Sequence, residues 1–148
     1  MEKQIQEAVE LFEEVLIYGT ERVLRSVDEQ LWKEYSPEQI QVLKLIGKEG
    51  MATAGRLATL QGVHKSAISS RLKKLLEKNL VKQVPSEDKR EKLLALTDDG
   101  KEVVMKSDYV IHSYIEKLLS DKVDDYEIEQ FLRTFRKLKE ILKMDGVK

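Results

Sequence analysis

The chain has 148 residues and a formal net charge of −1, and 36% of its residues are charged, well above the roughly one quarter usual in globular proteins. This length suits one domain, or a small domain with a helical extension, and the excess of charge favours long exposed helices. The chain has no cysteine, which excludes disulfides, thiolate metal sites and cysteine-based redox sensing. It also has neither a run of about 20 apolar residues nor a hydrophobic signal core. We therefore expect a cytoplasmic protein with no membrane partner.

The first predicted element is a long amphipathic helix that ends near Tyr35. Apolar residues recur along it at helical spacing over about seven turns. They are Ile5, Ala8, Val9, Phe12, Val15, Leu16, Val23, Leu24, Val27 and Leu31. The next residues supply an N-cap serine, Ser36, a proline at the first helical position and a glutamine, Gln39, three residues after the cap. This capping box predicts a second helix over residues 37–48.

Two shorter helices joined by a tight turn come next. Thr53 is a suitable N-cap for the first, residues 54–60, whose buried side is expected to carry Leu57 and Leu60. A turn at residues 61–63, which contains a glycine, leads to the second helix.

The second helix of this pair is predicted over residues 65–78. Its inward side carries large apolar residues, and its outward side carries serines and basic residues. The inward residues are Ile68, Leu72, Leu75 and Leu76. Asn79 can end the helix, because asparagine tolerates the left-handed backbone conformation.

Two short runs rich in branched residues, 80–84 and 93–96, predict the strands of a hairpin. The residues between them, 85–92, are polar and form a charged tip. Thr97 is then a suitable N-cap for another helix, with two aspartates in its first turn, where the helix dipole favours negative charge.

Two C-terminal helices are predicted, separated near residues 120–121, and each has one wide apolar face. The apolar residues of the first are Val103, Val104, Val110, Ile111, Tyr114, Ile115, Leu118 and Leu119, and those of the second are Ile128, Phe131, Leu132, Phe135, Leu138, Ile141 and Leu142. The predicted fold class is therefore mainly α with a small β-hairpin wing. We divide the chain into an N-terminal helix (1–35), a central domain (36–97) and C-terminal helices (98–148).

The outer helices carry more apolar surface than a small central domain can cover, so they need a partner. A second copy of the chain would supply it in a two-fold homodimer, with residues 1–35 and 98–148 as the dimerisation parts.

Basic residues concentrate in the middle of the chain. Residues 64–92 contain nine basic and four acidic side chains, a net charge of +5, so the rest of the chain carries −6. A basic centre flanked by acidic ends is typical of a nucleic-acid-binding segment joined to other parts.

The order of elements points to the same function. Two helices joined by a tight turn and followed by a basic hairpin form a winged helix-turn-helix. The second helix of such a pair fits the major groove, where short polar side chains can approach base edges. Ser66, Ser69 and Ser70 meet that requirement.

Several residues resemble the MarR family of transcriptional regulators. Residues 62–72 are similar to its recognition helix, Leu80-Val81 after Asn79 resembles its usual glycine-leucine-valine exit, and Asp88-Lys89-Arg90 followed by Leu96-Thr97 resembles its wing. The resemblance covers residues 36–101, and the outer helices agree in order and length.

The resemblance implies a DNA-binding regulator, specifically a repressor, that acts on a pseudo-palindromic operator. Arg90 would enter the minor groove from the wing tip, Asp88 would orient it by a charge-assisted hydrogen bond, and Lys89 would lie on a phosphate. The residues expected at the major groove or its phosphates are His64, Lys65, Ser66, Ser69, Ser70, Arg71 and Lys74.

Two positions depart from the family pattern. Asn79 replaces the usual glycine, and Ser70 stands where the family often has arginine, with Arg71 next to it. Which of Ser70 and Arg71 contacts bases stays open at this point.

The family resemblance also implies a small aromatic or amphipathic effector that binds between the dimerisation helices and the winged domain. Aromatic residues that could line its pocket are Tyr18, Trp32, Tyr35 and Tyr109, although aromatic residues on amphipathic helices more often belong to a core.

Other functions have less support. A winged helix can serve as a protein-docking surface, and a charged helix face or hairpin tip taken alone is typical of any solvated surface. The sequence offers no nucleophile-base pair and no glycine-rich phosphate loop, so an enzyme is not expected. His64 has no partner at metal-ligand spacing, and we expect no metal and no cofactor.

Overall fold

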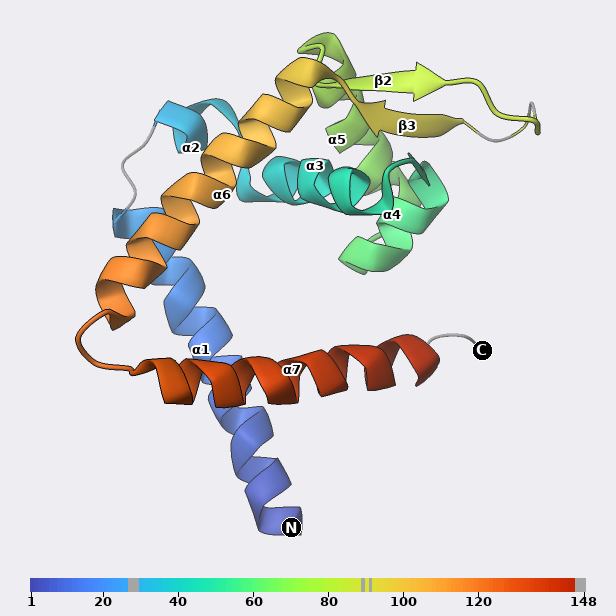
Figure 1. The fold of residues 1–148 in the computed structure, drawn as a ribbon. Coiled ribbons are helices and arrows are strands. Elements are labelled where there is room, and N and C mark those ends of the chain that lie inside the picture. Colours follow the sequence, from blue (N-terminus) through green and yellow to red (C-terminus); the bar gives the residue numbers. More distant parts are fainter. Residues whose placement is uncertain (27–29, 89, 91, 146–148) are drawn as a thin grey trace. The chain divides into compact units, whose positions relative to one another are not determined.

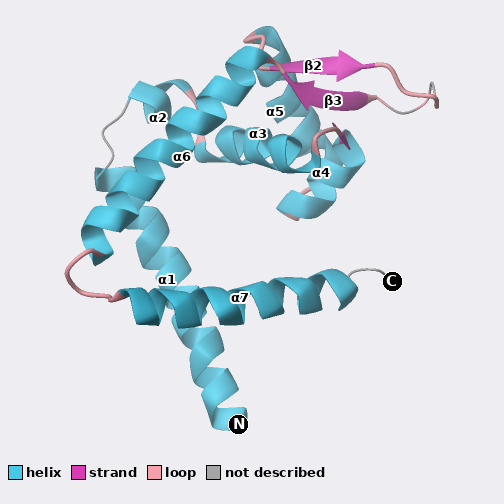
Figure 2. Cartoon of the chain, viewed as in Figure 1, coloured by secondary structure: helices cyan, strands magenta, loops and turns pink. Residues whose placement is uncertain are grey.

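The computed structural model describes residues 1–26, 30–88, 90 and 92–145. It is mainly helical with one small antiparallel sheet, as the sequence predicted (Figures 1 and 2). The chain divides into two compact units, Met1–Ile111 and His112–Lys148. The elements, in chain order, are α1 (Glu2–Ser26), α2 (Gln30–Glu34), α3 (Pro37–Glu49), β1 (Ala52–Thr53), α4 (Ala54–Gln61), α5 (Lys65–Glu77), β2 (Val81–Val84), β3 (Leu93–Leu96), α6 (Asp98–Leu119) and α7 (Asp125–Asp145). None of the described helices is long and apolar enough to cross a membrane.

The N-terminal segment forms two helices where the sequence predicted one. Helix α1 ends at Ser26 and α2 begins at Gln30. The residues between them, which include Val27 of the predicted apolar stripe, lie outside the described part of the chain. Apolar spacing continues across both helices, so periodicity alone does not separate them.

Helix α3 begins with the predicted capping box. The main-chain N–H of Gln39 donates to the Ser36 hydroxyl at 3.1 Å, and the Ser36 N–H donates to Gln39 Oε1 at 3.2 Å. A side-chain cap of this kind contributes about 0.5–2 kcal/mol relative to alanine. It fixes the start of the helix that lies at the centre of the core.

The core lies within the first unit, where α3, α4 and α5 pack on the sheet. Its buried members come from three helices and all three strands or their ends. They are Val42, Leu43, Ile46, Ala52, Leu57, Ala58, Ile68, Leu72, Leu75, Leu80, Val81, Leu94 and Leu96.

Two leucines predicted to face inward are exposed instead. Leu60 and Leu76 are each 36% exposed, and Ala58 takes the buried place next to Leu57 in α4. A helical stripe predicts which direction is buried, but its edges depend on the neighbouring elements. Both leucines lie at such an edge.

The sheet has three strands in the order β1-β3-β2, whereas the sequence predicted two. The predicted hairpin is present, with β2 antiparallel to β3 in a register that pairs Val81 with Leu96 and Val84 with Leu93. The additional strand, β1, pairs antiparallel with β3 on its other side. Its partner is about forty residues away in sequence, and a two-residue strand has no periodicity of its own.

The hairpin and α6 meet at a junction built around Thr97. Its N–H donates to the Leu80 carbonyl at 3.1 Å, its hydroxyl donates to the Asn79 carbonyl at 2.7 Å, and the same hydroxyl accepts from the Gly100 N–H at 3.0 Å. The last bond is the predicted helix cap. Thr97 therefore connects the end of α5, the sheet and the start of α6.

In the second unit, α7 begins with a capping box of its own. The Glu127 N–H donates to Asp124 Oδ1 at 2.8 Å, and the Asp124 N–H donates to Glu127 Oε1 at 3.3 Å. The apolar residues predicted for this helix are exposed in the single chain. They are Ile128, Phe131, Leu132, Phe135, Leu138, Ile141 and Leu142.

Candidate DNA-binding surface

The turn between α4 and α5 sets the geometry of the helix pair. Gly62 adopts the left-handed conformation, with φ 66° and ψ 36°, and the Val63 N–H donates to the Ala58 carbonyl at 3.0 Å. His64 then stands at the N-cap of α5 with extended backbone, and its imidazole makes no capping hydrogen bond. The imidazole and the Lys65 side chain are exposed at the first turn of α5.

Helix α5 has one buried and one exposed side. Ile68, Leu72 and Leu75 are buried in the core. The exposed residues that carry hydroxyl or ammonium groups are Lys65, Ser66, Ser69, Ser70, Lys73 and Lys74. Short hydroxyls on an exposed helix face leave room for base edges, and lysines beside them suit phosphates.

Arg71 differs from these exposed residues in its burial and in its contacts. It is half-buried, and its Nη1 donates a hydrogen bond to Gln61 Oε1 on α4. Gln61 in turn donates through Nε2 to Gln41 Oε1 at 2.8 Å and to the Glu38 carbonyl at 3.3 Å. Arg71 is therefore tied to α3 and α4, whereas Ser70 faces solvent.

Helix α5 is terminated by Asn79, in the left-handed conformation that the sequence predicted. Asn79 adopts the left-handed conformation with φ 60°, its N–H donates to the Leu76 carbonyl at 3.0 Å, and the Leu80 N–H donates to the Leu75 carbonyl at 3.0 Å. This pair of hydrogen bonds is a Schellman motif. It directs the chain into β2 at the start of the wing.

Lys78 connects this end of α5 to α2. Its Nζ donates to the Glu34 carbonyl at 2.8 Å and lies 4.5 Å from the centre of the Tyr35 ring. Burial first, and then the nearby Glu34 carboxylate, raise the pKa of the Tyr35 phenol above its ordinary value. The ring is therefore neutral at physiological pH and presents its π-face to the ammonium group.

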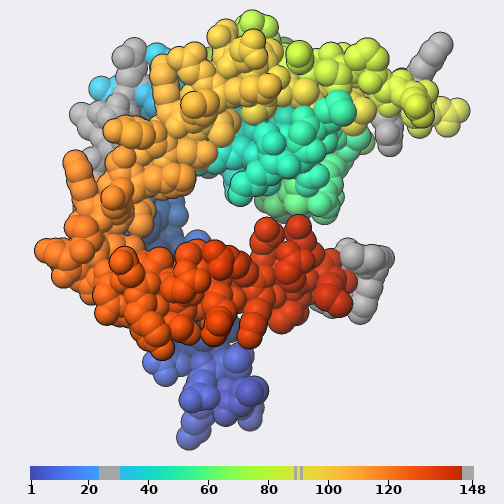
Figure 3. Space-filling model, viewed as in Figure 1, coloured from blue at the N-terminus to red at the C-terminus, as the bar shows by residue number. Residues whose placement is uncertain are grey.

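The wing is the β2–β3 hairpin with its tip. In the space-filling view it is yellow-green and projects past the helical part of its unit (Figure 3). At the tip, Asp88 Oδ1 accepts a hydrogen bond from the main-chain N–H of Arg90 at 2.9 Å, and the Asp88 N–H donates to the Ser86 hydroxyl at 3.3 Å. The hydrogen bond that links Asp88 to Arg90 in the structure is made by the Arg90 backbone N–H. Arg90 is exposed, and Lys89 lies outside the described residues.

A cavity of about 350 Å³ lies between α5 and the sheet. Ser69 and Lys73 of α5 line it together with Gln83 of β2 and Lys92, which precedes β3. Lys73 and Lys92 were not among the residues predicted for the DNA site. Lys73 could have been found from spacing, because it follows Ser66 by seven residues, or about two helical turns. The position of Lys92 depends on the strand register.

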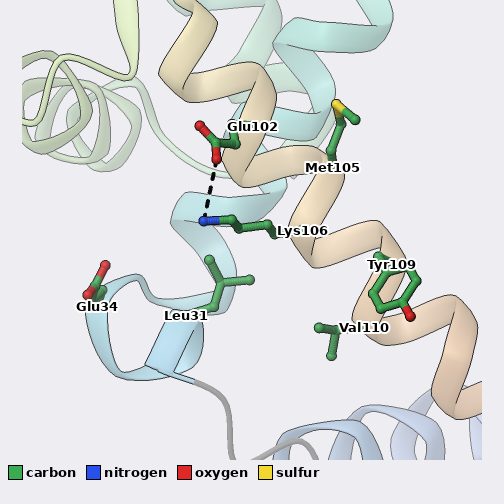
Figure 4. Close-up of a pocket in the computed structure, with 7 residues that line it drawn as sticks. All are labelled: Leu31, Glu34, Glu102, Met105, Lys106, Tyr109 and Val110. Carbon is green, nitrogen blue, oxygen red and sulfur yellow. Dashed lines mark ion pairs between the residues drawn. The ribbon is translucent and has the colours of Figure 1, made fainter.

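The sequence predicted four aromatic residues for an effector pocket, and they come from different elements of the structure. A cavity of about 710 Å³ between α2 and α6 is lined by Leu31, Glu34, Glu102, Met105, Lys106, Tyr109 and Val110 (Figure 4). Of the predicted four, only Tyr109 is among these lining residues. Tyr18 is 62% exposed on α1, and Tyr35 packs against the core. Trp32 is half-buried on α2, next in sequence to Leu31.

Three charged residues, Glu34, Glu102 and Lys106, line this cavity. Lys106 Nζ lies 3.6 Å from Glu102 Oε1, and Figure 4 shows both side chains directed toward α2. Within the described residues, no group of three or more histidine, aspartate or glutamate side chains could hold a metal ion.

Comparison with known proteins relates this chain to DNA-binding transcriptional regulators. The model of the MarR family matches residues 35–91. The chain is 39% identical over 145 residues to the uncharacterized HTH-type transcriptional regulator YdgG of Bacillus subtilis, covering 96% of this chain and 95% of that protein.

Solved structures share the fold at lower identity. A MarR family protein from Bacillus stearothermophilus aligns with a TM-score of 0.77 at 20% identity, covering 97% of this chain and 98% of that one. Streptococcus pneumoniae FabT, solved in complex with DNA, aligns with a TM-score of 0.64 at 22% identity, covering 97% of this chain and 98% of that one.

Proposed function

Because the chain belongs to the MarR family, we propose that this DNA-binding transcriptional regulator is a cytoplasmic repressor that acts as a homodimer on a pseudo-palindromic operator. The relatives are named as transcriptional regulators rather than enzymes. The observation that carries the proposal is that one unit joins a serine- and lysine-bearing face of α5 to a projecting wing that ends in Arg90.

In this proposal α5 enters the major groove. Ser66, Ser69 and Ser70 approach base edges, because their side chains are short and exposed. The groups placed on phosphates are His64, Lys65, Lys73 and Lys74. Phosphate contacts set the register of the protein on the duplex, and the serines supply sequence discrimination.

The wing contacts the minor groove. Arg90 enters it, because a narrow minor groove has enhanced negative potential. Asp88 holds the tip by accepting the Arg90 N–H, which limits the directions that the arginine can take. From the sequence alone, Lys89 is assigned to a neighbouring phosphate.

The proposal assigns DNA binding and dimerisation to different parts of the chain. Residues 36–97 bind DNA, and residues 1–35 and 98–148 dimerise. The large apolar residues exposed on α1 and α7 support this assignment, since a monomer rarely exposes so extended an apolar surface. A two-fold dimer would present two α5 helices to successive major grooves about 34–36 Å apart.

The cavity between α2 and α6 is the proposed effector site. Its volume of about 710 Å³ suits a small molecule, and its apolar residues Leu31, Met105 and Val110, together with the Tyr109 ring, suit an aromatic or amphipathic one. Such a ligand changes the affinity for DNA only if it binds the DNA-bound and the DNA-free arrangements of the dimer with different affinities.

The single tryptophan offers a test of the effector site. Trp32 follows Leu31, which lines the cavity, so titration with benzoate or 4-hydroxybenzoate is expected to change its fluorescence. Tyr109→Ala should weaken the response, whereas Tyr18→Ala should not. Equal fluorescence responses from the wild type and both variants would show that this cavity is not the effector site.

The DNA-binding proposal is tested by fluorescence anisotropy on duplex DNA from upstream of the gene, at several salt concentrations. The wild-type affinity is expected to fall steeply with salt, with a log–log slope of about −0.9 per phosphate contacted. Arg90→Ala should weaken binding, and Lys48→Ala, which removes an exposed lysine from the end of α3, should not. No binding to any duplex at low salt would instead favour a protein-docking module.

A further inference from the structure

We propose that Arg71 is a positioning residue for DNA recognition, which fixes the rotation of α5 on α3 and α4 and does not itself contact bases. This inference rests on the proposed function, since it concerns how α5 is presented to DNA. It answers the question that the sequence left open between Ser70 and Arg71.

The Arg71 side chain is held against α4 by its hydrogen bond to Gln61. Successive residues on a helix are rotated by about 100°, so Arg71 lies beside the buried line of Ile68, Leu72 and Leu75. Ser70 lies farther from that line, on the exposed face with Ser66 and Lys73. To reach a base, Arg71 would have to leave its hydrogen bond to Gln61 and extend around the helix.

Both polar atoms of the Gln61 amide have hydrogen-bond partners. Its oxygen accepts from Arg71 Nη1, and its nitrogen donates to Gln41 Oε1 and to the Glu38 carbonyl. An amide has two N–H donors and one carbonyl, so this set of partners fixes its orientation. The reversed amide would point N–H groups at the guanidinium, which has only donors.

Apolar packing alone does not fix the rotation of α5 about its axis. Burial of Ile68 and Leu75 is favourable but not directional, so it constrains the rotation of α5 only loosely. The Arg71–Gln61–Gln41 chain joins three helices by directional bonds. Rotating α5 would break the first of them and turn Ser66, Ser70 and Lys73 away from the groove together.

A double-mutant cycle tests the network without DNA. Arg71→Met and Gln61→Met keep most of the aliphatic side chain and remove the hydrogen bond, and each should lower the thermal unfolding midpoint. The double variant should lose no more than the larger single loss, because either change already breaks the bond. Strictly additive losses would overturn the inference even if the wild type binds DNA.

The same variants then test the role in recognition. At a salt concentration where the wild type binds its upstream duplex, both single variants and the double variant should bind about tenfold more weakly, the fold-change of one charge-assisted hydrogen bond. The salt slope should match that of the wild type. A direct phosphate contact by Arg71 would instead lower the slope by about 1 and leave Gln61→Met unaffected.

A base contact by Arg71 predicts a third pattern. Its removal would relax discrimination at one base pair, which a panel of single-base operator variants would reveal, and Gln61→Met would not reproduce it. The matched comparison is Ser70→Ala, which should change discrimination without changing the unfolding midpoint. If the wild type binds no duplex, both the proposed DNA-binding function and the positioning role of Arg71 are wrong. If the wild type binds DNA but the losses in unfolding midpoint are additive, only the positioning role is wrong.

Discussion

Gly100 lies so close to the main-chain carbonyl of Leu80 that a β-carbon on residue 100 would come within 2.1 Å of that oxygen. The oxygen cannot move away freely, because it also accepts the Thr97 N–H at 3.1 Å. The start of α6 therefore approaches the base of the wing in a way that only glycine permits. We expect Gly100→Ala to lower the free energy of unfolding by about 1–3 kcal/mol, measured by urea titration at a fixed protein concentration.

The matched control is Gly55→Ala in α4. A β-carbon there would meet Lys65 Cε and Thr53 Oγ1 at 3.9 Å each, which is ordinary van der Waals contact. This substitution is expected to be neutral or to stabilise by about 0.5–1 kcal/mol, because alanine loses less conformational entropy in a helix than glycine. Equal losses at both positions would show that close packing at Leu80 is not the cause.

A second prediction concerns the wing tip. Asp88→Ala removes the acceptor of the Arg90 N–H, so the tip should sample more conformations and bind operator DNA more weakly. Asp88→Asn keeps an oxygen at the same place and should retain most of the affinity. Anisotropy on one duplex at one salt concentration separates the two, and equal weakening by both would indicate that the charge of Asp88, rather than its hydrogen bond, matters.

The sequence predicted most strongly those features whose causes are local. The caps at Ser36, Thr53 and Thr97 form the hydrogen bonds that their side chains suggested, and Asn79 has the left-handed backbone that ends α5. Each depends on residues within a few positions along the chain.

The features that it missed depend on partners distant in sequence. β1 exists because Ala52 and Thr53 pair with Leu94 and Leu93, and the Arg71 side chain is held by a hydrogen bond to Gln61 of the preceding helix. Periodicity gave the direction of the buried stripe but not its edge, which is why Leu76 was misplaced.

A third prediction concerns Lys73, which lines the cavity between α5 and the sheet. If its ammonium lies on a phosphate, Lys73→Met should weaken binding to all duplexes alike and reduce the salt slope by about 1. The control is Lys48→Met, which removes the same charge from an exposed position on α3. A loss confined to one operator sequence would mean that Lys73 contacts a base instead.

The last prediction concerns the exposed face of α7. Phe131 is 54% exposed in the single chain, and its ring centre lies 4.1 Å from that of Phe135, so the two rings form one apolar patch. If a second copy covers this patch, Phe131→Asp places a charge in the interface and should shift the protein from dimer to monomer at micromolar concentration. Lys137→Asp changes a residue away from the patch and should leave the dimer intact. Analytical ultracentrifugation compares the two, and a Phe131→Asp variant that still sediments as a dimer would exclude this face from the interface.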